Sequence, residues 1–570
     1  MVAALLLLGL PPLARAFSLA DVEAQARQLA ERPYQPPATG KLTALDKLSY
    51  DAYRDIRYRP ERALWRAQKL PFELMFFHVG HSYRHPVRVF EINEDRVAPL
   101  GVPTDNFDFG RNAGLLRGAG PQAEVAGLRV HYPLNRKDYK DELVVFLGAS
   151  YFRTLGAGQQ YGLSARGLAV NVSSTEPEEF PRFDTFWVER PARNAKRLVI
   201  YARLDSPRLA GAYRFEITPG ATTQVAVQSR IFLRRSRVAG DSRVEPPVLG
   251  LAPLTSMFLS GESRPRPGDF RPEVHDSDGL QVQSATGEWI WRPLLNPERP
   301  QTTSFSLSGL KGFGLLQRDR RFASYEDLEA RYERRPSVWI EPRGQWGAGR
   351  VELMQYHTAD EASDNTVAYW VPAKLPPVGQ PLALDYVMHW FKDAPPAAPG
   401  AWAVQSRCGA GHEKLAPNEV QYHIDFTGPA LERLPRNAKV QAAVSASANG
   451  TLRLAQVQHD PALHTWRLTL RAARQALDQP LELRAHLVLG REVLTETWSL
   501  ALPPLNPGGD ACWQTAGAGT QPATPPPPAP AAPPPPPPSR PPPPAAPDSA
   551  PAGAAVPAPK PAEAPKNAVP

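Results

Sequence analysis

Cysteine is scarce in this 570-residue chain, and the two that occur, Cys408 and Cys512, lie far apart in the sequence. Neither has a second cysteine three positions away, which argues against a CxxC zinc site. In an oxidising compartment such a pair either forms a disulfide or stays as two buried thiols, and both alternatives remain open. A disulfide would tie the end of a C-terminal domain to its start.

Other signatures are also absent. After the leucine-rich N-terminus, no stretch reaches the about 20 apolar residues that span a bilayer. The glycine-rich segment 156–167 lacks the GK[ST] of a phosphate-binding loop, and Ser164 lacks the G-x-S-x-G context of an acyl hydrolase. The net charge of +8 is spread out, without a lysine block or arginine stripe. We therefore expect no nucleic-acid partner, and no cofactor or metal.

The two ends of the chain have unusual compositions. The leucine-rich start leads to Ala14-Arg15-Ala16, an A-x-A site that predicts a signal peptide over residues 1–16 and export. At the other end, residues 521–570 hold 23 of the 66 prolines. Such a segment cannot form a packed core, so residues 516–570 are expected to be an extended, disordered tail. The tail could act as a spacer, as a ligand for a proline-binding groove, or only as a solvated end.

Between these ends, short alternating runs rich in Val, Ile, Phe and Tyr predict antiparallel strands. We expect a large N-terminal β-sandwich over 17–392 and an immunoglobulin-like β-sandwich over 400–515, hence an all-β protein with few short helices. Strands are predicted over 72–79, 87–92, 142–152, 168–172, 197–204, 212–220, 223–233, 439–448, 452–458, 465–472, 481–489 and 493–502. Helices are predicted from Ser18 to just before Pro33, within 49–65 with a break at Pro60, and over 324–335, with Ser324 as its cap.

Two clusters of carboxylates stand at strand ends, where binding sites are often built. One is HDSDGL, with Asp276 and Asp278, and the other is HTADEASDN, with Asp360, Glu361 and Asp364. Two carboxylates from separate loops are the usual equipment for glycosidic cleavage. Asp-x-Asp-Gly is also ordinary turn chemistry. A calcium loop is disfavoured, because the distal Glu of the EF-hand pattern is missing.

Tryptophan is the second candidate for sugar recognition. Trp289 and Trp291 alternate along a predicted strand and should point to the same side. Their rings, and further ones in the chain, could stack on the apolar faces of pyranose rings or could be core residues. The further candidate platforms are Trp339, Trp346 and Trp370.

Long strings of the sequence resemble a known family. YDAYRDIRYRPERALW, RPEVHDSDGL, GEWIWRPLLNP and DNTVAYWVP are similar to the periplasmic glucans biosynthesis proteins, the G/D family of osmoregulated periplasmic glucan synthesis. The resemblance covers roughly residues 17–515 and leaves out the proline-rich tail. It implies a long cleft in the first sandwich and a periplasmic location. It also implies a role in making a β-1,2-linked glucan backbone, with a membrane glucosyltransferase as partner.

The resemblance also implies roles for individual residues. Some members of the family are inverting endo-β-1,2-glucanases, and their catalytic pair maps onto Asp364 as general acid and Asp276 as general base. Burial, or the neighbouring Asp360 and Glu361, would raise the pKa of Asp364 by disfavouring its charged form. The residues expected to contact sugar or support the acids are Asp278, Glu361, Tyr356, Arg271 and the tryptophans, and Arg166, Arg292 and Arg318 could bind sugar hydroxyls or pair with the acids.

Two functions follow from these expectations. The first is an inverting β-1,2-glucan hydrolase that trims or releases nascent backbone. The second is a non-catalytic factor that holds the glucan for export, branching or cyclisation. Both use the same cleft, and the second domain could dock the synthase in either case. Exposed strand edges in the second domain would also suit a homodimer.

Overall fold

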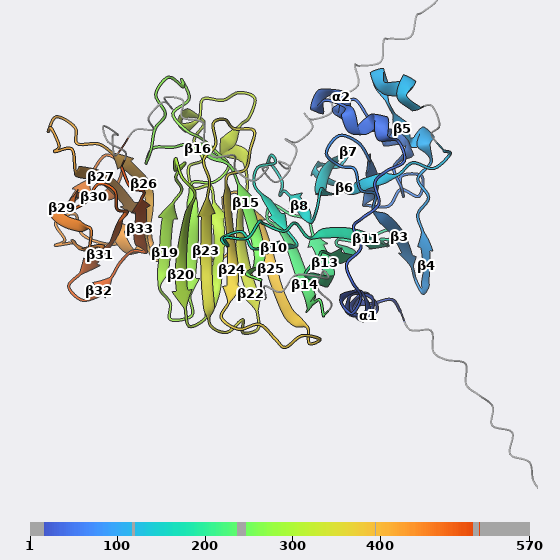
Figure 1. Ribbon diagram of the computed structural model, residues 1–570. Helices are drawn as coiled ribbons and strands as arrows, with labels where there is room; N and C mark the ends of the chain where they lie inside the picture. The colour runs from blue at the N-terminus through green and yellow to red at the C-terminus, as the bar shows by residue number, and fades with distance from the viewer. Residues whose placement is uncertain (1–15, 117–119, 236–246, 394, 506–511, 513–570) are drawn as a thin grey trace, which may run out of the picture. The chain divides into compact units, whose positions relative to one another are not determined.

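Two large sheets form most of the described structure, a computed structural model (Figure 1). It describes residues 16–116, 120–235, 247–393, 395–505 and 512. The predicted signal peptide, apart from Ala16, and the predicted tail lie outside the described residues. The prediction of a mostly β protein built from antiparallel sheets is confirmed.

The first sheet has ten strands, all paired antiparallel. In spatial order they are β2 (Glu73–His78), β6 (Val125–Arg136), β7 (Tyr139–Leu147), β8 (Tyr151–Thr154), β9 (Ser164–Arg166), β15 (Leu249–Ser256), β24 (Thr366–Pro372), β23 (Gly349–Gln355) and β20 (Gln301–Leu307), with β10 (Leu168–Val170) beside β15.

The second sheet has fifteen strands and runs from one sandwich into the other. Its order is β28 (Gln441–Ala446), β31 (Leu481–Leu489), β33 (Thr497–Leu502), β19 (Trp289–Pro293), β18 (Gly279–Ser284), β21 (Leu310–Leu316), β22 (Ser337–Arg343), β25 (Leu382–Phe391), β14 (Thr223–Leu233), β13 (Leu209–Thr218), β12 (Leu198–Asp205), β11 (Arg182–Glu189), β3 (Arg88–Asn93) and β4 (Arg96–Pro99), with β32 (Glu492–Val493) beside β31. The β3–β11 and β19–β33 pairs are parallel.

The main hydrophobic core lies between these two sheets. Phe146 of β7, in the first sheet, contacts Phe186 of β11 and Phe215 of β13, in the second, with ring centroids 5.4 and 5.2 Å apart. Buried residues alternate with more exposed ones along β14, as expected for a strand packed on one face, whereas the first five residues of β12 and of β13 are all buried. The first part of the chain is therefore a β-sandwich.

The helices are few and short. α1 (Leu19–Ala30) begins after Ser18, whose backbone N–H donates to the Asp21 carboxylate at 2.7 Å, and it packs on β12 to β14 (Figure 1). This confirms the first predicted helix. The others are α2 (Tyr50–Arg54), α3 (Pro429–Glu432) and the 3₁₀ turns η1 (Thr43–Lys47), η2 (Pro60–Arg62), η3 (Thr104–Asn106), η4 (Gly110–Leu116), η5 (Phe322–Ser324) and η6 (Tyr332–Arg334). Among the described residues, no helix is long and apolar enough to cross a membrane.

The helix predicted over 324–335 is wrong. Only η5 and η6 form there, because Glu326 and Arg331 have left-handed backbone angles, with φ of 56° and 46°. The Asp327 carboxylate accepts backbone N–H groups two and three residues ahead, a turn that competes with helix formation. Tertiary contacts of this segment, described below, override its helical pattern.

In the second sandwich, β28, β31 and β33 pack against a separate four-stranded sheet. That sheet is ordered β26 (Trp402–Cys408), β27 (Glu419–Thr427), β30 (Thr465–Arg474) and β29 (Gly450–Asp460). Its core includes Trp291 and Trp339 of the first sandwich as well as residues beyond 400. The division at 392–400 therefore stays a prediction about folding units, while the two sandwiches share one sheet and the first contributes side chains to the core of the second.

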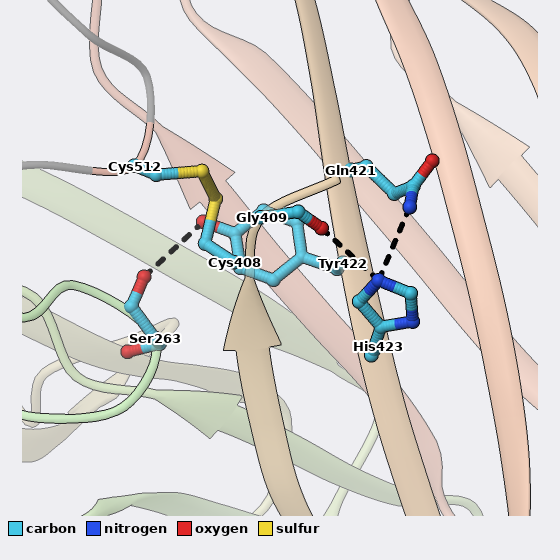
Figure 2. The surroundings of a disulfide bond; sticks show 7 residues. All are labelled: Ser263, Cys408, Gly409, Gln421, Tyr422, His423 and Cys512. Carbon is cyan, nitrogen blue, oxygen red and sulfur yellow. Dashed lines mark hydrogen bonds between the residues drawn. A yellow bond between two sulfur atoms is a disulfide. The ribbon is translucent and has the colours of Figure 1, made fainter. Parts of the chain in front are cut away.

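A disulfide joins Cys408, the last residue of β26, to Cys512, across 104 positions of sequence (Figure 2). Among the described residues no cysteine is free. The adjacent Tyr422 donates its hydroxyl to the backbone oxygen of Ser263, at 3.5 Å. The bond fastens residue 512 to the edge of the second sandwich next to a loop of the first.

Candidate active site

Asp276 is the first of the two predicted catalytic carboxylates. It follows β17 (Val274–His275), a two-residue strand paired with β16 (Phe258–Ser260), and precedes β18. Its backbone N–H donates to the oxygen of Met257 at 2.8 Å. Its carboxylate is buried and forms an ion pair with the Arg335 guanidinium. The residue just before β16 thus holds Asp276 in place.

Asp364 is attached to the same short segment through its neighbour Asn365. The backbone N–H of Asn365 donates to Ser256 at 3.1 Å, and its side chain accepts from the N–H of Phe258 at 2.8 Å. The side-chain amide also donates to the oxygen of Phe258 at 2.9 Å. Residues 256–258 therefore anchor both acids, which brings together two loops almost ninety positions apart in the sequence.

The electrostatic surroundings of Asp364 favour its protonated form. Burial is the largest cause, and the charge of Asp276 is the second; together they raise the pKa of Asp364 to about 6. The guanidinium groups of Arg153, Arg166 and Arg335 act in the opposite direction but do not outweigh them. The predicted effect of Asp360 and Glu361 is not among these causes. Burial, the other predicted cause, is confirmed as the largest one, and the second is the charge of the other catalytic candidate, Asp276.

Two polar atoms of this site are buried without a hydrogen-bond partner in the described part of the chain. They are Oδ2 of Asp364 and Nε of Arg335. Most buried polar groups in proteins are paired, so a cluster of exceptions needs a reason. A site that awaits a polar ligand supplies one.

A chain of contacts connects Asp276 to the protein surface. Arg335 lies over the Tyr332 ring, with its guanidinium carbon 4.1 Å from the centroid. The Tyr332 hydroxyl donates to Glu361 at 3.1 Å, and Arg271 donates to the same carboxylate oxygen at 2.6 Å. Sequence reasoning missed Tyr332 and Arg335, because it assigned both to a helix.

His275 lies beside Asp276 but belongs to a separate ion cluster. Burial alone would favour the neutral ring, but the hydrogen bond to Glu273 and the charge of Asp278 outweigh it and raise the pKa of His275 to about 9. Nε2 lies 3.0 Å from Glu273 and 3.4 Å from Asp278. Gln317 donates to two backbone oxygens, so its own oxygen faces Nδ1 at 2.9 Å, and that nitrogen carries a proton.

This cluster is the place where a metal ion could be considered. The donor atoms of Glu273, His275 and Asp278 all lie within 4.8 Å of one another. Both ring nitrogens are engaged as donors, however, so the imidazolium itself supplies the positive charge between the carboxylates. A cavity of about 30 Å³ adjoins the cluster and is also lined by Glu262 and Arg318. We interpret the cluster as a rigid mount for the Asp276 loop.

Comparison with known proteins identifies the family. A family model described as periplasmic glucan biosynthesis protein, MdoG, matches residues 17–502. The chain belongs to this family. It is 48% identical over 510 residues to the glucans biosynthesis protein G of Ralstonia nicotianae, covering 88% of this chain and 99% of that protein. It is also 44% identical over 498 residues to the protein of the same name in Pseudomonas aeruginosa, covering 86% and 93%.

The tryptophans of this MdoG-family chain do not line the candidate site. Trp289 and Trp291 share one side of β19, as alternation predicts, but the second sandwich packs on that side together with Trp339. Trp370 is 0% exposed in the main core, and Trp346 is half-buried against it. The prediction that Trp291, Trp339 and Trp370 are sugar platforms is corrected on this ground, because no face of these buried rings is open to a ligand. For the half-buried Trp289 and Trp346 it stays a prediction.

The remaining predicted residues are structural or lie at the margin. Tyr356 donates its hydroxyl to Val172 at 3.2 Å, and its backbone pairs with Asn365, so it holds the Asp364 loop. Asp278 accepts the backbone N–H groups of residues 318 and 319 through one oxygen. The predicted arginines all pair with acids: Arg166 with Glu178, Arg271 with Asp269, Asp327 and Glu361, Arg292 with Glu482, and Arg318 with Glu496.

Proposed function

We propose that this MdoG-family protein is an inverting endo-β-1,2-glucanase that processes the glucan backbone in the periplasm. The observation that carries the proposal is the unequal state of two carboxylates anchored to one segment. Asp364 is held protonated up to a pH of about 6, whereas Asp276 is paired with a guanidinium. Carboxyl groups whose environments differ in this way are suited to opposite roles in glycoside cleavage.

The proposed chemistry uses each carboxyl once. Asp364 donates its proton to the glycosidic oxygen as the bond to C1 breaks, so the leaving sugar departs as an alcohol. Asp276 accepts a proton from a water molecule that attacks C1 from the opposite face. The new hydroxyl at C1 has the inverted configuration. The same proposal has two further parts. Residues 1–16 direct export and are then removed, and the protein cooperates with a membrane glucosyltransferase.

The test is product analysis with the full chain and linear β-1,2-glucan. We expect short β-1,2-linked oligosaccharides, and because the linkage is β, the new reducing ends should appear first as α-anomers, detected by NMR. New reducing ends that appear first as β-anomers would contradict the inverting mechanism. Failure to cleave would contradict the hydrolase.

The rate should depend on pH through Asp364. Because the general acid must carry its proton, we expect kcat/KM to fall about tenfold per pH unit above a pH of about 6. The measurement is the initial rate of reducing-end release between pH 4.5 and 8.5. A rate that stays flat between pH 6 and 8 would rule out Asp364 as the acid.

The raised pKa of Asp364 also predicts how the stability of the protein changes with pH. This second measurement tests the pKa independently of the rate. The folded-state pKa of Asp364 lies above its ordinary value of 3.8, so the folded protein holds this proton more tightly than the unfolded chain. Its contribution to stability therefore decreases as pH rises from about 4 to about 6. Asp364→Asn should be more stable than the wild type at pH 7, but not at pH 4.

One observation favours the alternative of a non-catalytic glucan-holding factor. Arg335 occupies the carboxylate of Asp276, which would have to accept a proton from water. In that case the protein should bind linear β-1,2-glucan with the same affinity at pH 5 and pH 8 and leave its length unchanged. Calorimetry with size analysis of the recovered glucan distinguishes the two functions.

A further inference from the structure

The two most exposed large apolar side chains of the described residues are Phe270, at 80%, and Leu328, at 81%. They come from separate loops, more than fifty positions apart in the sequence. Exposed single apolar residues are common on proteins. These two differ because both are presented by rigid turns, and the two turns are tied together.

Each side chain stands inside a turn closed by an aspartate. In the first turn, Asp269 accepts the backbone N–H of Arg271 at 3.0 Å, which leaves Phe270 between them. In the second, Asp327 accepts the N–H groups of Glu329 at 2.9 Å and Ala330 at 2.7 Å, beyond Leu328. Such side-chain-to-backbone bonds fix the turn and hold the intervening side chain outward.

One guanidinium joins the two turns. Arg271 binds Asp269 at 3.0 Å and Asp327 at 3.0 Å, and the same group binds Glu361 at 2.6 Å. Phe270 and Leu328 are each next in sequence to an aspartate that binds Arg271, and these two exposed residues are called the patch below. Glu361, whose side chain is 43% exposed, adds an acceptor at the margin of that patch.

The patch is connected to the candidate active site. Glu361 precedes Asp364 by three residues and accepts the hydroxyl of Tyr332, whose ring carries the Arg335 guanidinium. Arg335 in turn pairs with Asp276. The patch is therefore linked by a series of contacts to Asp276 and by the chain itself to the Asp364 loop.

We propose that Phe270 and Leu328 form a subsite for a glucopyranose ring of the β-glucan chain, at the margin of the Asp276 and Asp364 site. The ring's C–H face would pack on the phenyl group, and Glu361 would accept a sugar hydroxyl. An aromatic face with carboxylate oxygens beside it suits a neutral ligand that has one apolar face and polar edges. The subsite rests on the proposed function, since it needs glucan at the neighbouring acids.

The test measures binding separately from cleavage. The parent is the full-length Asp364→Asn protein, and the probe is a linear β-1,2-glucooligosaccharide, titrated by calorimetry at pH 7. We expect Phe270→Ala to raise Kd about tenfold, which corresponds to about 1.4 kcal/mol. Leu328→Ala should raise it less, and Phe270→Trp should retain binding. A role in folding alone would not be rescued by tryptophan in this way.

The matched control is Leu463→Ala in the second sandwich. Leu463 is 56% exposed and donates its own backbone N–H to Asp460 at 3.2 Å, so it is an exposed leucine in an aspartate-closed turn away from the acids. Its Kd should be that of the parent. If Phe270→Ala binds as well as this control, the subsite is wrong and the proposed function stands. If the parent itself does not bind the oligosaccharide, both proposals fail. If Phe270→Ala binds glucan normally but loses a protein partner, the patch is a protein-docking surface instead.

Discussion

Asp276→Asn and Asp364→Asn should each lower kcat for linear β-1,2-glucan by about three orders of magnitude, with Kd changed less than about threefold. Each amide keeps the shape of the side chain but can neither give nor take the proton. General acid and base groups contribute about 10² to 10⁴ each to a rate. The measurement is reducing-end release under saturating substrate, together with calorimetry of the same proteins.

Asp360→Asn is the control for this comparison. Asp360 lies in the same loop, four residues before Asp364, but it is exposed, and its carboxylate accepts the backbone N–H of Ala362 at 3.0 Å. This substitution should leave kcat within about twofold. Loss of activity in Asp360→Asn, or full activity in either amide variant of the pair, would place the catalytic carboxyls elsewhere.

Glu496→Ala should lower the free energy of unfolding by about 3 to 5 kcal/mol. Glu496 is a buried residue just before β33, and both of its oxygens bind the Arg318 guanidinium, at 2.6 and 2.8 Å. It also accepts the backbone N–H of Ala403 and the amide of Gln281, each at 3.0 Å. Removing the carboxylate leaves two buried donors without this acceptor, and it leaves the Arg318 guanidinium without its ion-pair partner, with the backbone oxygen of Ala403 still accepting from it at 2.7 Å.

The expected loss of stability in Glu496→Ala is large because the Arg318 guanidinium stays buried. Arg318 lies 3.5 Å above the Trp291 ring and cannot turn into water without opening the junction between the sandwiches. Urea unfolding followed by tryptophan fluorescence measures the loss. Glu496→Gln should cost less, because it retains an acceptor oxygen. Glu492→Ala, at an exposed position of β32, should cost less than about 0.5 kcal/mol. Equal losses for Glu492→Ala and Glu496→Ala would contradict the argument.

The junction also explains why the second sandwich matters for the first. Arg318 follows Gln317, the residue that orients His275 and contacts the backbone of Tyr332. Loosening the Arg318 anchor should therefore disturb the mount of Asp276 as well as the stability of the protein. The sequence showed none of this, because Glu496 and Arg318 are 178 positions apart.

Sequence patterns predicted a strand or helix correctly where that element depends on interactions between neighbouring residues. The alternating runs over 72–79, 223–233 and 481–489 correspond to β2, β14 and β31. Ser18, Asp21 and the apolar spacing of the first helix correspond to α1. In each case the period of the side chains sets which face can be buried, and that period is written in consecutive residues.

The helix predicted over 324–335 failed for the opposite reason. Its residues have a helical pattern, but Asp327 forms an ion pair with Arg271, and Arg335 forms one with Asp276. Those partners lie more than fifty positions away in the sequence. Distant charges and the local Asp327 turn together exceed the small intrinsic preference for a helix.

In the candidate site, too, some features follow from local sequence and others from contacts between distant residues. By itself the sequence determined a β-rich protein with two carboxylate loops and, through its resemblance, a place in the periplasmic glucan family. Only the tertiary structure decided which polar and aromatic groups meet there. It buries Trp291 and Trp370, exposes Phe270, and pairs Asp276 with Arg335. Exposure and charge pairing depend on what packs across a strand or loop from elsewhere in the chain, and no local pattern contains that information.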